Sequence, residues 1–119
     1  MIISGIVLIL GGILVAAISE AAARGRLGVN FVAGIRTRAL MMSEEAWTAG
    51  HKAARIPMGL AGLVMFLAGA AIITLRRDGD TTGPLVLACA VAAVLLVLIG
   101  AAVATRAANR TLAGGLSAD

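Results

Sequence analysis

Three long apolar stretches dominate this chain: Ile2 to Ala17, Pro57 to Leu75 and Pro84 to Thr105. Each approaches the ~20 residues that a helix needs to cross a hydrocarbon core of ~30 Å. A soluble domain of 119 residues has no interior large enough to bury three such helices, whereas in lipid a helix satisfies its own backbone hydrogen bonds. The sequence therefore predicts an all-α integral membrane protein in one membrane domain, residues 1–119.

The apolar stretches also predict how the chain is divided. We expect spans at about residues 2–19, 57–75 and 84–105, a loop at 20–56, an outer turn at 76–83 and a tail at 106–119. Gly79 and Gly83 favour a tight turn before Pro84, so spans two and three should form an antiparallel hairpin. The Gly- and Ala-rich tail is expected to be frayed. Because no Lys or Arg precedes Arg24, the first stretch lacks the basic start of a signal peptide and is expected to be retained.

The distribution of basic residues predicts an orientation. Arg24, Arg26, Arg36, Arg38, Lys52 and Arg55 fall in the loop, Arg76 and Arg77 in the outer turn, and Arg106 and Arg110 in the tail. Loop and tail share one side of a three-span protein, so that side should be cytoplasmic and the N-terminus should lie outside. The net charge of +4 is explained by this bias and by anionic lipid. No aromatic residues alternate with the basic ones, so a nucleic-acid partner is not expected.

Small residues recur at four-residue spacing within the spans. Gly12 with Ala16, and Gly100 with Ala104, are two such pairs. Pairs of this kind let helix backbones approach closely. We expect at least one of them to lie at a helix contact, within the chain or between copies of it.

The loop carries signals for a short helix. Ser43 is suited to cap a helix N-terminus, and Glu44 and Glu45 then meet the positive end of the helix dipole. Nothing breaks a helix from there until Pro57, which predicts a short interfacial helix that bends at Pro57 into the second span. Trp47 is expected at the depth of the lipid headgroups, where amphipathic rings are enriched.

Glu44, Trp47, His51 and Arg55 follow one another at three- and four-residue spacing, so they are expected to share one stripe of that helix. His51 is expected to bond to Glu44, to a backbone carbonyl or to a headgroup. It is the only histidine, and a zinc site needs several ligands. No metal or cofactor is therefore expected.

Two further residues precede the short helix. Gly34 permits a tight backbone turn. Arg36 presents a fork of donors suited to a carboxylate or a phosphate. It should either pair with Glu44 or Glu45 and hold the loop, or contact a lipid phosphate or an acidic group on a partner.

These residues together resemble the hallmark of a known family. The sequence reads G-I-R-T, then S-E-E-A-W, then H, and the matching residues are Gly34, Arg36, Thr37, Ser43, Glu44, Trp47 and His51. The pattern is similar to that of the SdpI family, which takes its name from the immunity protein against a sporulation-delay toxin. The founding member is longer and has more spans, so this chain resembles the short, three-span members.

The resemblance implies an immunity or resistance protein of the bacterial plasma membrane. Such a protein binds a membrane-active peptide or toxin, or shields its target, and a signalling variant docks a transcriptional repressor on its cytoplasmic face. The alternative is a structural accessory subunit of a larger membrane complex, because Gly- and Ala-rich spans suit close packing. An enzyme is not expected, since no nucleophile with a base and an oxyanion device is evident. The partners expected are membrane lipids, a toxin or repressor, and copies of the chain itself or a larger complex.

Overall fold

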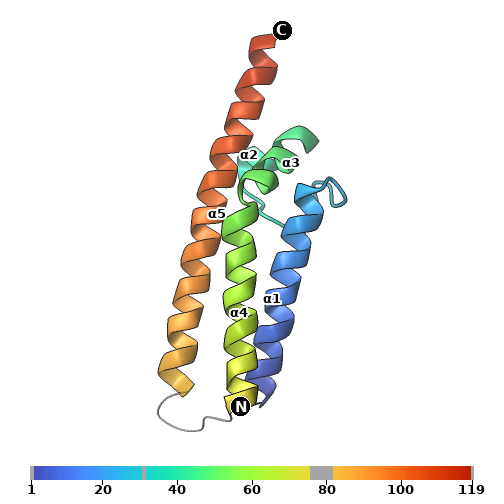
Figure 1. Ribbon diagram of the computed structural model, residues 1–119. Coiled ribbons are helices and arrows are strands. Elements are labelled where there is room, and N and C mark those ends of the chain that lie inside the picture. The colour runs from blue at the N-terminus through green and yellow to red at the C-terminus, as the bar shows by residue number, and fades with distance from the viewer. Residues whose placement is uncertain (1, 31, 76–81, 119) are drawn as a thin grey trace.

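The structure is a computed structural model that describes residues 2–30, 32–75 and 82–118. Its helices are α1 (Ile2–Ala23), α2 (Arg38–Met41), α3 (Glu44–Ala53), α4 (Arg55–Leu75) and α5 (Thr82–Ala118). The helices α1, α4 and α5 are long and apolar enough to cross a membrane. They lie side by side in an elongated molecule of 61 × 22 × 20 Å (Figure 1). The predicted all-α fold with three membrane helices and short helices between them is confirmed.

The three long helices form a row with α4 in the middle. α4 packs against α1 on one side and against α5 on the other. In the described part of the chain, α1 and α5 do not pack directly on each other. The end of α1, both short helices, the start of α4 and the second half of α5 gather at the end of the row opposite the N-terminus (Figure 1). We call residues 24–54, with residues 104–114 of α5, the head region.

Most of the loop and the described part of the tail lie at the same end of the bundle (Figure 1). Which side of the membrane this end faces remains a prediction. The outer turn at 76–83 lies largely outside the described residues, and so do Gly79, Arg76 and Arg77. Gly83 and Pro84 are already part of α5, which begins at Thr82.

Glycines bring α1 and α4 into close contact. A Cβ on Gly12 would lie 2.8 Å from the Phe66 nitrogen and would also collide with the carbonyl oxygen of Gly62. Gly5 and Gly69 form a second close contact of this kind, seven residues away from Gly12 in α1 and from Gly62 in α4. Seven-residue spacing in both helices keeps such contacts on one seam of an antiparallel pair.

Both predicted small-residue pairs lie at helix contacts. A Cβ built on Gly62 of α4 would lie 3.1 Å from Ala16, the partner of Gly12 in the first pair. In α5, a Cβ on Gly100 would lie 2.9 Å from the sulfur of Met58, and Ala104 is completely buried. The prediction is therefore confirmed for contacts within the chain.

Two predicted boundaries are wrong. The bend lies at Ala54, between α3 and α4, rather than at Pro57. Pro57 sits in the first turn of α4, where a backbone N–H has no helical partner and its loss costs little. The tail is helical rather than frayed: it forms the last part of α5, which is continuous for 37 residues up to Ala118. Alanine favours the helix here. Ala108 belongs to the buried cluster around Trp47, and Leu112 packs against that cluster.

The main cluster of buried apolar residues lies in the head region and at the adjoining ends of α1 and α4. It is formed by Ala22, Ile35, Leu40, Ala46, Trp47, Ala54, Met58, Ala104 and Ala108. Most large apolar side chains of the spans are exposed instead, as expected where lipid is the solvent. The chain thus carries a small globular core at the end of an open row of membrane helices.

Candidate functional site

Trp47 forms the centre of the head region. Its side chain is 0% exposed, and its indole N–H donates to the carbonyl oxygen of Leu27 at 2.7 Å. The fully buried Leu40 belongs to the same core. The Trp47 ring has no exposed surface for contact with lipid headgroups, and its depth in the membrane stays a prediction. The loop before α2 folds over the ring and replaces lipid as its surroundings, which also satisfies the buried N–H.

His51 is held by backbone groups at both ring nitrogens. It is 1% exposed, and its Nε2 accepts from the backbone N–H of Ile35 at 2.9 Å. Its Nδ1 lies 2.9 Å from the carbonyl oxygen of Trp47. An N–H donor facing Nε2 requires the proton to be on Nδ1, so the ring is neutral and donates to Trp47. Of the partners predicted for His51, the backbone carbonyl is confirmed.

The surroundings of His51 favour this neutral state. Burial lowers the pKa of His51, and the hydrogen bond to the Trp47 carbonyl opposes that effect only in part. The two rings also contact each other, with centroids 4.4 Å apart. The neutral imidazole therefore connects α3 to the loop through one hydrogen bond on each side of the ring.

Gly34 is required by its conformation and by its neighbours. Its φ of +102° lies in a region that disfavours side chains. A Cβ there would lie 2.8 Å from Cη2 of Trp47 and 3.0 Å from Nε2 of His51. The loop backbone thus lies directly on the two rings, and the first element of the motif is joined to the last.

The remaining motif residues fasten the loop to α3 and α5. Ser43 accepts from the Ala46 N–H at 3.0 Å, which confirms the predicted N-cap. The carboxylate of Glu44 accepts from the backbone N–H of Val29 at 3.2 and 3.3 Å. The hydroxyl groups of Thr37 and Thr105 are hydrogen bonded at 3.0 Å, which links the loop to α5.

Arg36 lies on the exposed surface of the loop, directly after the buried Ile35. Its predicted pairing with Glu44 or Glu45, or with a lipid or partner, stays a prediction. The contacts described above involve six of the seven motif residues, and Arg36 lies among the exposed residues of the head region.

Asn30 is a structural residue that the sequence analysis missed. Its side-chain oxygen accepts from the N–H groups of Val32 and Ala33 at 2.9 and 2.7 Å. Its side-chain nitrogen donates to the carbonyl oxygens of Gly28 and Ala33 at 2.9 and 3.1 Å. An asparagine between glycines is typical of such turns, so the signal was present in the sequence.

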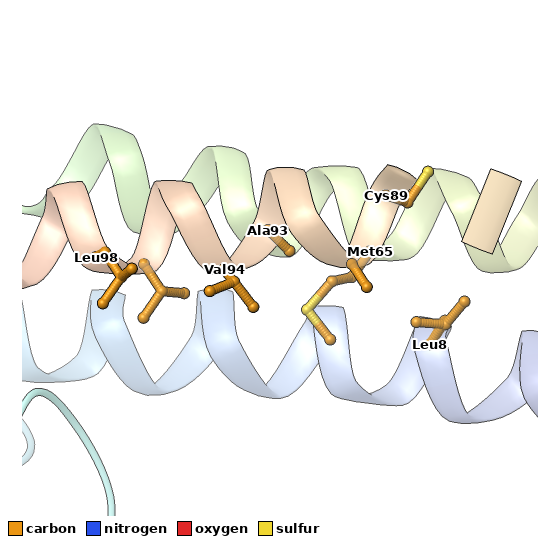
Figure 2. A pocket seen from close by; sticks show the side chains of 8 residues that line it. Leu8, Met65, Cys89, Ala93, Val94 and Leu98 are labelled. Carbon is orange, nitrogen blue, oxygen red and sulfur yellow. The ribbon is translucent and has the colours of Figure 1, made fainter. Parts of the chain in front are cut away.

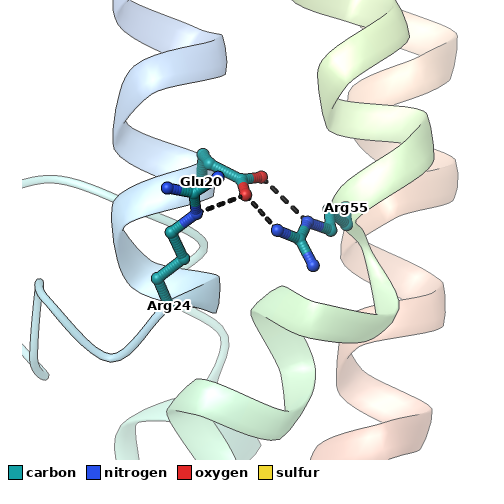
Figure 3. A network of polar contacts seen from close by, with 3 residues as sticks. All are labelled: Glu20, Arg24 and Arg55. Atoms are coloured by element: carbon teal, nitrogen blue, oxygen red, sulfur yellow. Dashed lines mark hydrogen bonds and ion pairs between the residues drawn. The ribbon is translucent and has the colours of Figure 1, made fainter.

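An ion-pair network joins α1 to α4 just below the head region. Glu20 accepts from Nε of Arg24 at 2.9 Å and from Nε of Arg55 at 2.9 Å, and the Arg55 guanidinium makes a second contact with it (Figure 3). Arg55 was predicted to continue the stripe of Glu44, Trp47 and His51. The bend at Ala54 instead places it at the start of α4.

An apolar groove runs between α1 and α5, where these helices do not pack on each other. It has a volume of about 310 Å³ and is lined by Leu8, Met65, Cys89, Ala90, Ala93, Val94, Val97 and Leu98. Figure 2 shows the side chains of α1 and α5 on either side of it, with Met65 of α4 between them. Within the described ranges, no group of three or more His, Cys, Asp or Glu residues is placed to hold a metal ion.

Comparison with known proteins assigns the family. A protein-family model described as the SdpI/YfhL protein family matches residues 26–105, which include most of the loop, all of α2, α3 and α4, and most of α5. Neither the curated proteins nor the solved structures gave a match. The matched residues make up more than half of the chain and contain every motif residue of the head region. The chain therefore belongs to the SdpI/YfhL protein family.

Proposed function

We propose that this protein protects a bacterial membrane against a membrane-active peptide or toxin by binding it, without catalysing a reaction. The observation that carries the proposal is the apolar groove between α1 and α5. Its volume falls in the range of about 300–1,000 Å³ that is typical of ligand sites. Because its lining belongs to the membrane spans, it suits the apolar side chains of a peptide that enters the bilayer.

The family motif has a supporting role in this proposal. α1 and α5 do not hold each other, so the width of the groove depends on α4 and on the head region. In the head region, α3 packs against both α1 and α5, and Glu20 ties α1 to Arg55 of α4. In this proposal the buried rings of Trp47 and His51 hold α1 and α5 at a fixed separation, and the groove between these helices binds the peptide.

The test is protection of sensitive bacteria that express the protein and are challenged with a panel of envelope-directed peptides. Ala90→Phe should fill the groove, because Ala90 is exposed and lines it. Ala88→Phe is the matched control, because Ala88 is exposed on the same helix but does not line the groove. Protection that is lost only in Ala90→Phe supports the proposal. Equal protection by both variants contradicts the role of the groove, and no protection by the parent protein contradicts the function.

We further propose that the head region faces the cytoplasm, where it is able to dock a regulator. The excess of Lys and Arg in residues 24–55 and 106–110 supports this orientation. The exposed Arg36 and Arg38 would face such a partner. Labelling a single cysteine introduced at residue 36, in a Cys89→Ser background, tests the orientation. If an impermeant thiol reagent modifies this cysteine in intact cells, the proposed orientation is contradicted.

A structural subunit is the second candidate. It is favoured by the length of α5, whose 37 residues extend about 55 Å at 1.5 Å per residue, well beyond a hydrocarbon core of ~30 Å. A helix of this length is able to contact a partner both in the membrane and outside it. Extraction in mild detergent followed by mass spectrometry distinguishes the candidates, because a stoichiometric larger partner would favour the subunit and its absence would oppose it.

A further inference from the structure

A second groove lies between α1 and α4, at the junction of the spans and the head region. It has a volume of about 480 Å³ and is lined by Ile13, Ala16, Ala17, Ser19, Glu20, Arg55 and Gly59. Its lining changes along its length, because apolar and small residues of the spans are followed by the charged pair Glu20 and Arg55. It is therefore amphipathic, unlike the groove between α1 and α5.

Gly59 has no packing partner that explains it. Cβ atoms on Gly62 and Gly69 of the same helix would collide with the backbone of α1, so these glycines are needed for the fold. A Cβ on Gly59 would meet no heavy atom within 4 Å. Glycine weakens a helix interior. The residue thus keeps the groove wide without serving a contact within the chain.

Ser19 is the second unexplained residue. It is 5% exposed and lines the groove, yet its hydroxyl makes no hydrogen bond to another residue in the described part of the chain. The helical hydroxyls of Thr74, Thr105 and Thr111 each bond to the carbonyl four residues earlier. In the described residues no fully buried side-chain oxygen or nitrogen lacks a hydrogen-bond partner, so the Ser19 hydroxyl is accessible from the groove, where it is able to bond to a ligand.

The charged residues that line the groove, Glu20 and Arg55, balance each other, and Arg24 beside them makes the surroundings of the groove's mouth positive. A single carboxylate, Glu20, is shared by Arg24 and Arg55. The contacts with Glu20 use two nitrogens of the Arg55 guanidinium, and the third points away from Glu20 (Figure 3). Guanidinium groups bind phosphate through several donors at once. The mouth therefore suits a phosphate group.

We propose that this groove binds one anionic phospholipid. The phosphate lies against Arg55 and the Ser19 hydroxyl, and one acyl chain follows Ile13, Ala17 and Gly59 into the bilayer. A free phosphate would leave the apolar part of the groove empty. A phospholipid has a phosphate for the charged end of the groove and an acyl chain for its apolar end. The inference does not depend on the proposed function, because this groove shares no lining residue with the groove between α1 and α5.

The experiment is native mass spectrometry of the full chain, titrated with phosphatidylglycerol or with phosphatidylcholine. One phosphatidylglycerol should remain bound per chain. Phosphatidylcholine has the same phosphate but also a choline cation, which Arg24 and Arg55 repel, so it should bind about tenfold more weakly. Gly59→Leu should fill the groove and weaken phosphatidylglycerol binding about tenfold, which corresponds to one overpacked side chain. Gly83→Leu is the matched control, because a Cβ on Gly83 also meets open space but lies at the far end of α5.

A second variant keeps the test decisive if the leucine disturbs the fold. Ser19→Ala removes only the hydroxyl and should weaken phosphatidylglycerol binding roughly fivefold. The emission of Trp47, the only tryptophan, reports whether the head region stays folded. Equal binding of the two lipids, or parental binding by both Gly59→Leu and Ser19→Ala, overturns the proposal. A stoichiometric polypeptide that occupies the groove in place of lipid also overturns it.

Discussion

Nε2 of His51 accepts a hydrogen bond from the backbone N–H of Ile35 at 2.9 Å, across sixteen residues of sequence. The bond works only while Nε2 is unprotonated, because a protonated ring would present an N–H to another N–H. Nδ1 is bonded to the Trp47 carbonyl, so the ring is not free to turn and relieve that conflict. The charge state of one side chain is thereby coupled to the seating of the loop.

This coupling predicts that the head region loosens as the pH falls. The pKa of His51 is lowered in the folded state, mainly by burial, whereas in an unfolded loop it is about 6.5. Below pH about 6.5 the open loop takes up a proton that the closed loop does not, so stability is full above that pH and is lost as the pH drops toward the folded-state pKa. Hydrogen exchange of the Ile35 amide, corrected for its intrinsic rate, should show this loss of protection.

The control for this prediction is His51→Gln, which removes the titrating ring. Its protection should be lower than that of the parent at neutral pH and should not change further between pH 7 and pH 5, a range that spans the ordinary histidine pKa of about 6.5. A parent protein whose Ile35 protection is constant over that range would contradict the coupling.

Gly34→Ala should destabilise the head region by two separate effects. A side chain at φ +102° costs about 1–3 kcal/mol by backbone strain alone. The new methyl group also meets Trp47 at 2.8 Å. Gly25→Ala isolates the strain, because Gly25 has φ +76° and a Cβ there meets nothing within 4 Å.

The measurement is limited trypsin digestion after the exposed Arg36 and Arg38. Gly34→Ala should be cleaved faster than Gly25→Ala, and the latter only slightly faster than the parent. Equal rates for the two variants would mean that the contact between the loop and the Trp47 ring does not contribute.

The spans and the start of α3 were predictable from the sequence because they depend on local properties. Hydropathy alone identifies helices that lie in lipid, and the Ser43 cap requires only an N–H three residues later. The contacts of Gly12 and Gly100 followed from spacing, since close packing in membranes favours small residues.

The interior of the head region was not predictable because it depends on residues far apart in sequence. The buried Trp47 donates a hydrogen bond to Leu27, twenty residues earlier. The general preference of tryptophan for membrane interfaces gave no indication of that partner. The bend at Ala54 follows from the seating of α3 on α5, where a Cβ on Gly50 would meet Leu40 at 2.6 Å and the Ala104 carbonyl at 3.0 Å. Local rules assigned the bend to Pro57, whereas tertiary packing decides it.

Trp47 variants should separate the hydrogen bond from the packing of the ring. Trp47→Phe loses the indole N–H and leaves the Leu27 carbonyl without it, at a cost of about 1 kcal/mol. Trp47→Ala empties the centre of the core and should cost about 3–5 kcal/mol. Hydrogen exchange of residues 27–54 should therefore rise modestly in the first variant and strongly in the second. If exchange in Trp47→Ala stays at the parental level, the head region does not depend on this ring.

Neighbouring glycines in α1 offer a matched test of the contact with α4. A Cβ on Gly12 would press on the Gly62 carbonyl oxygen and would lie 2.8 Å from the Phe66 nitrogen, and neither backbone atom is able to move aside. A Cβ on Gly11 would meet only the terminal methyl group of Met65, at 2.9 Å, which swings away easily. Gly12→Ala should therefore destabilise the protein by about 1–3 kcal/mol through overpacking. Gly11→Ala should be neutral or stabilising by up to about 1 kcal/mol, because alanine favours the helix.

Thermal unfolding in detergent, followed by the fluorescence of Trp47, measures the stability of both variants. A lower Tm for Gly11→Ala than for Gly12→Ala would show that the glycine seam between α1 and α4 does not set how closely these helices pack.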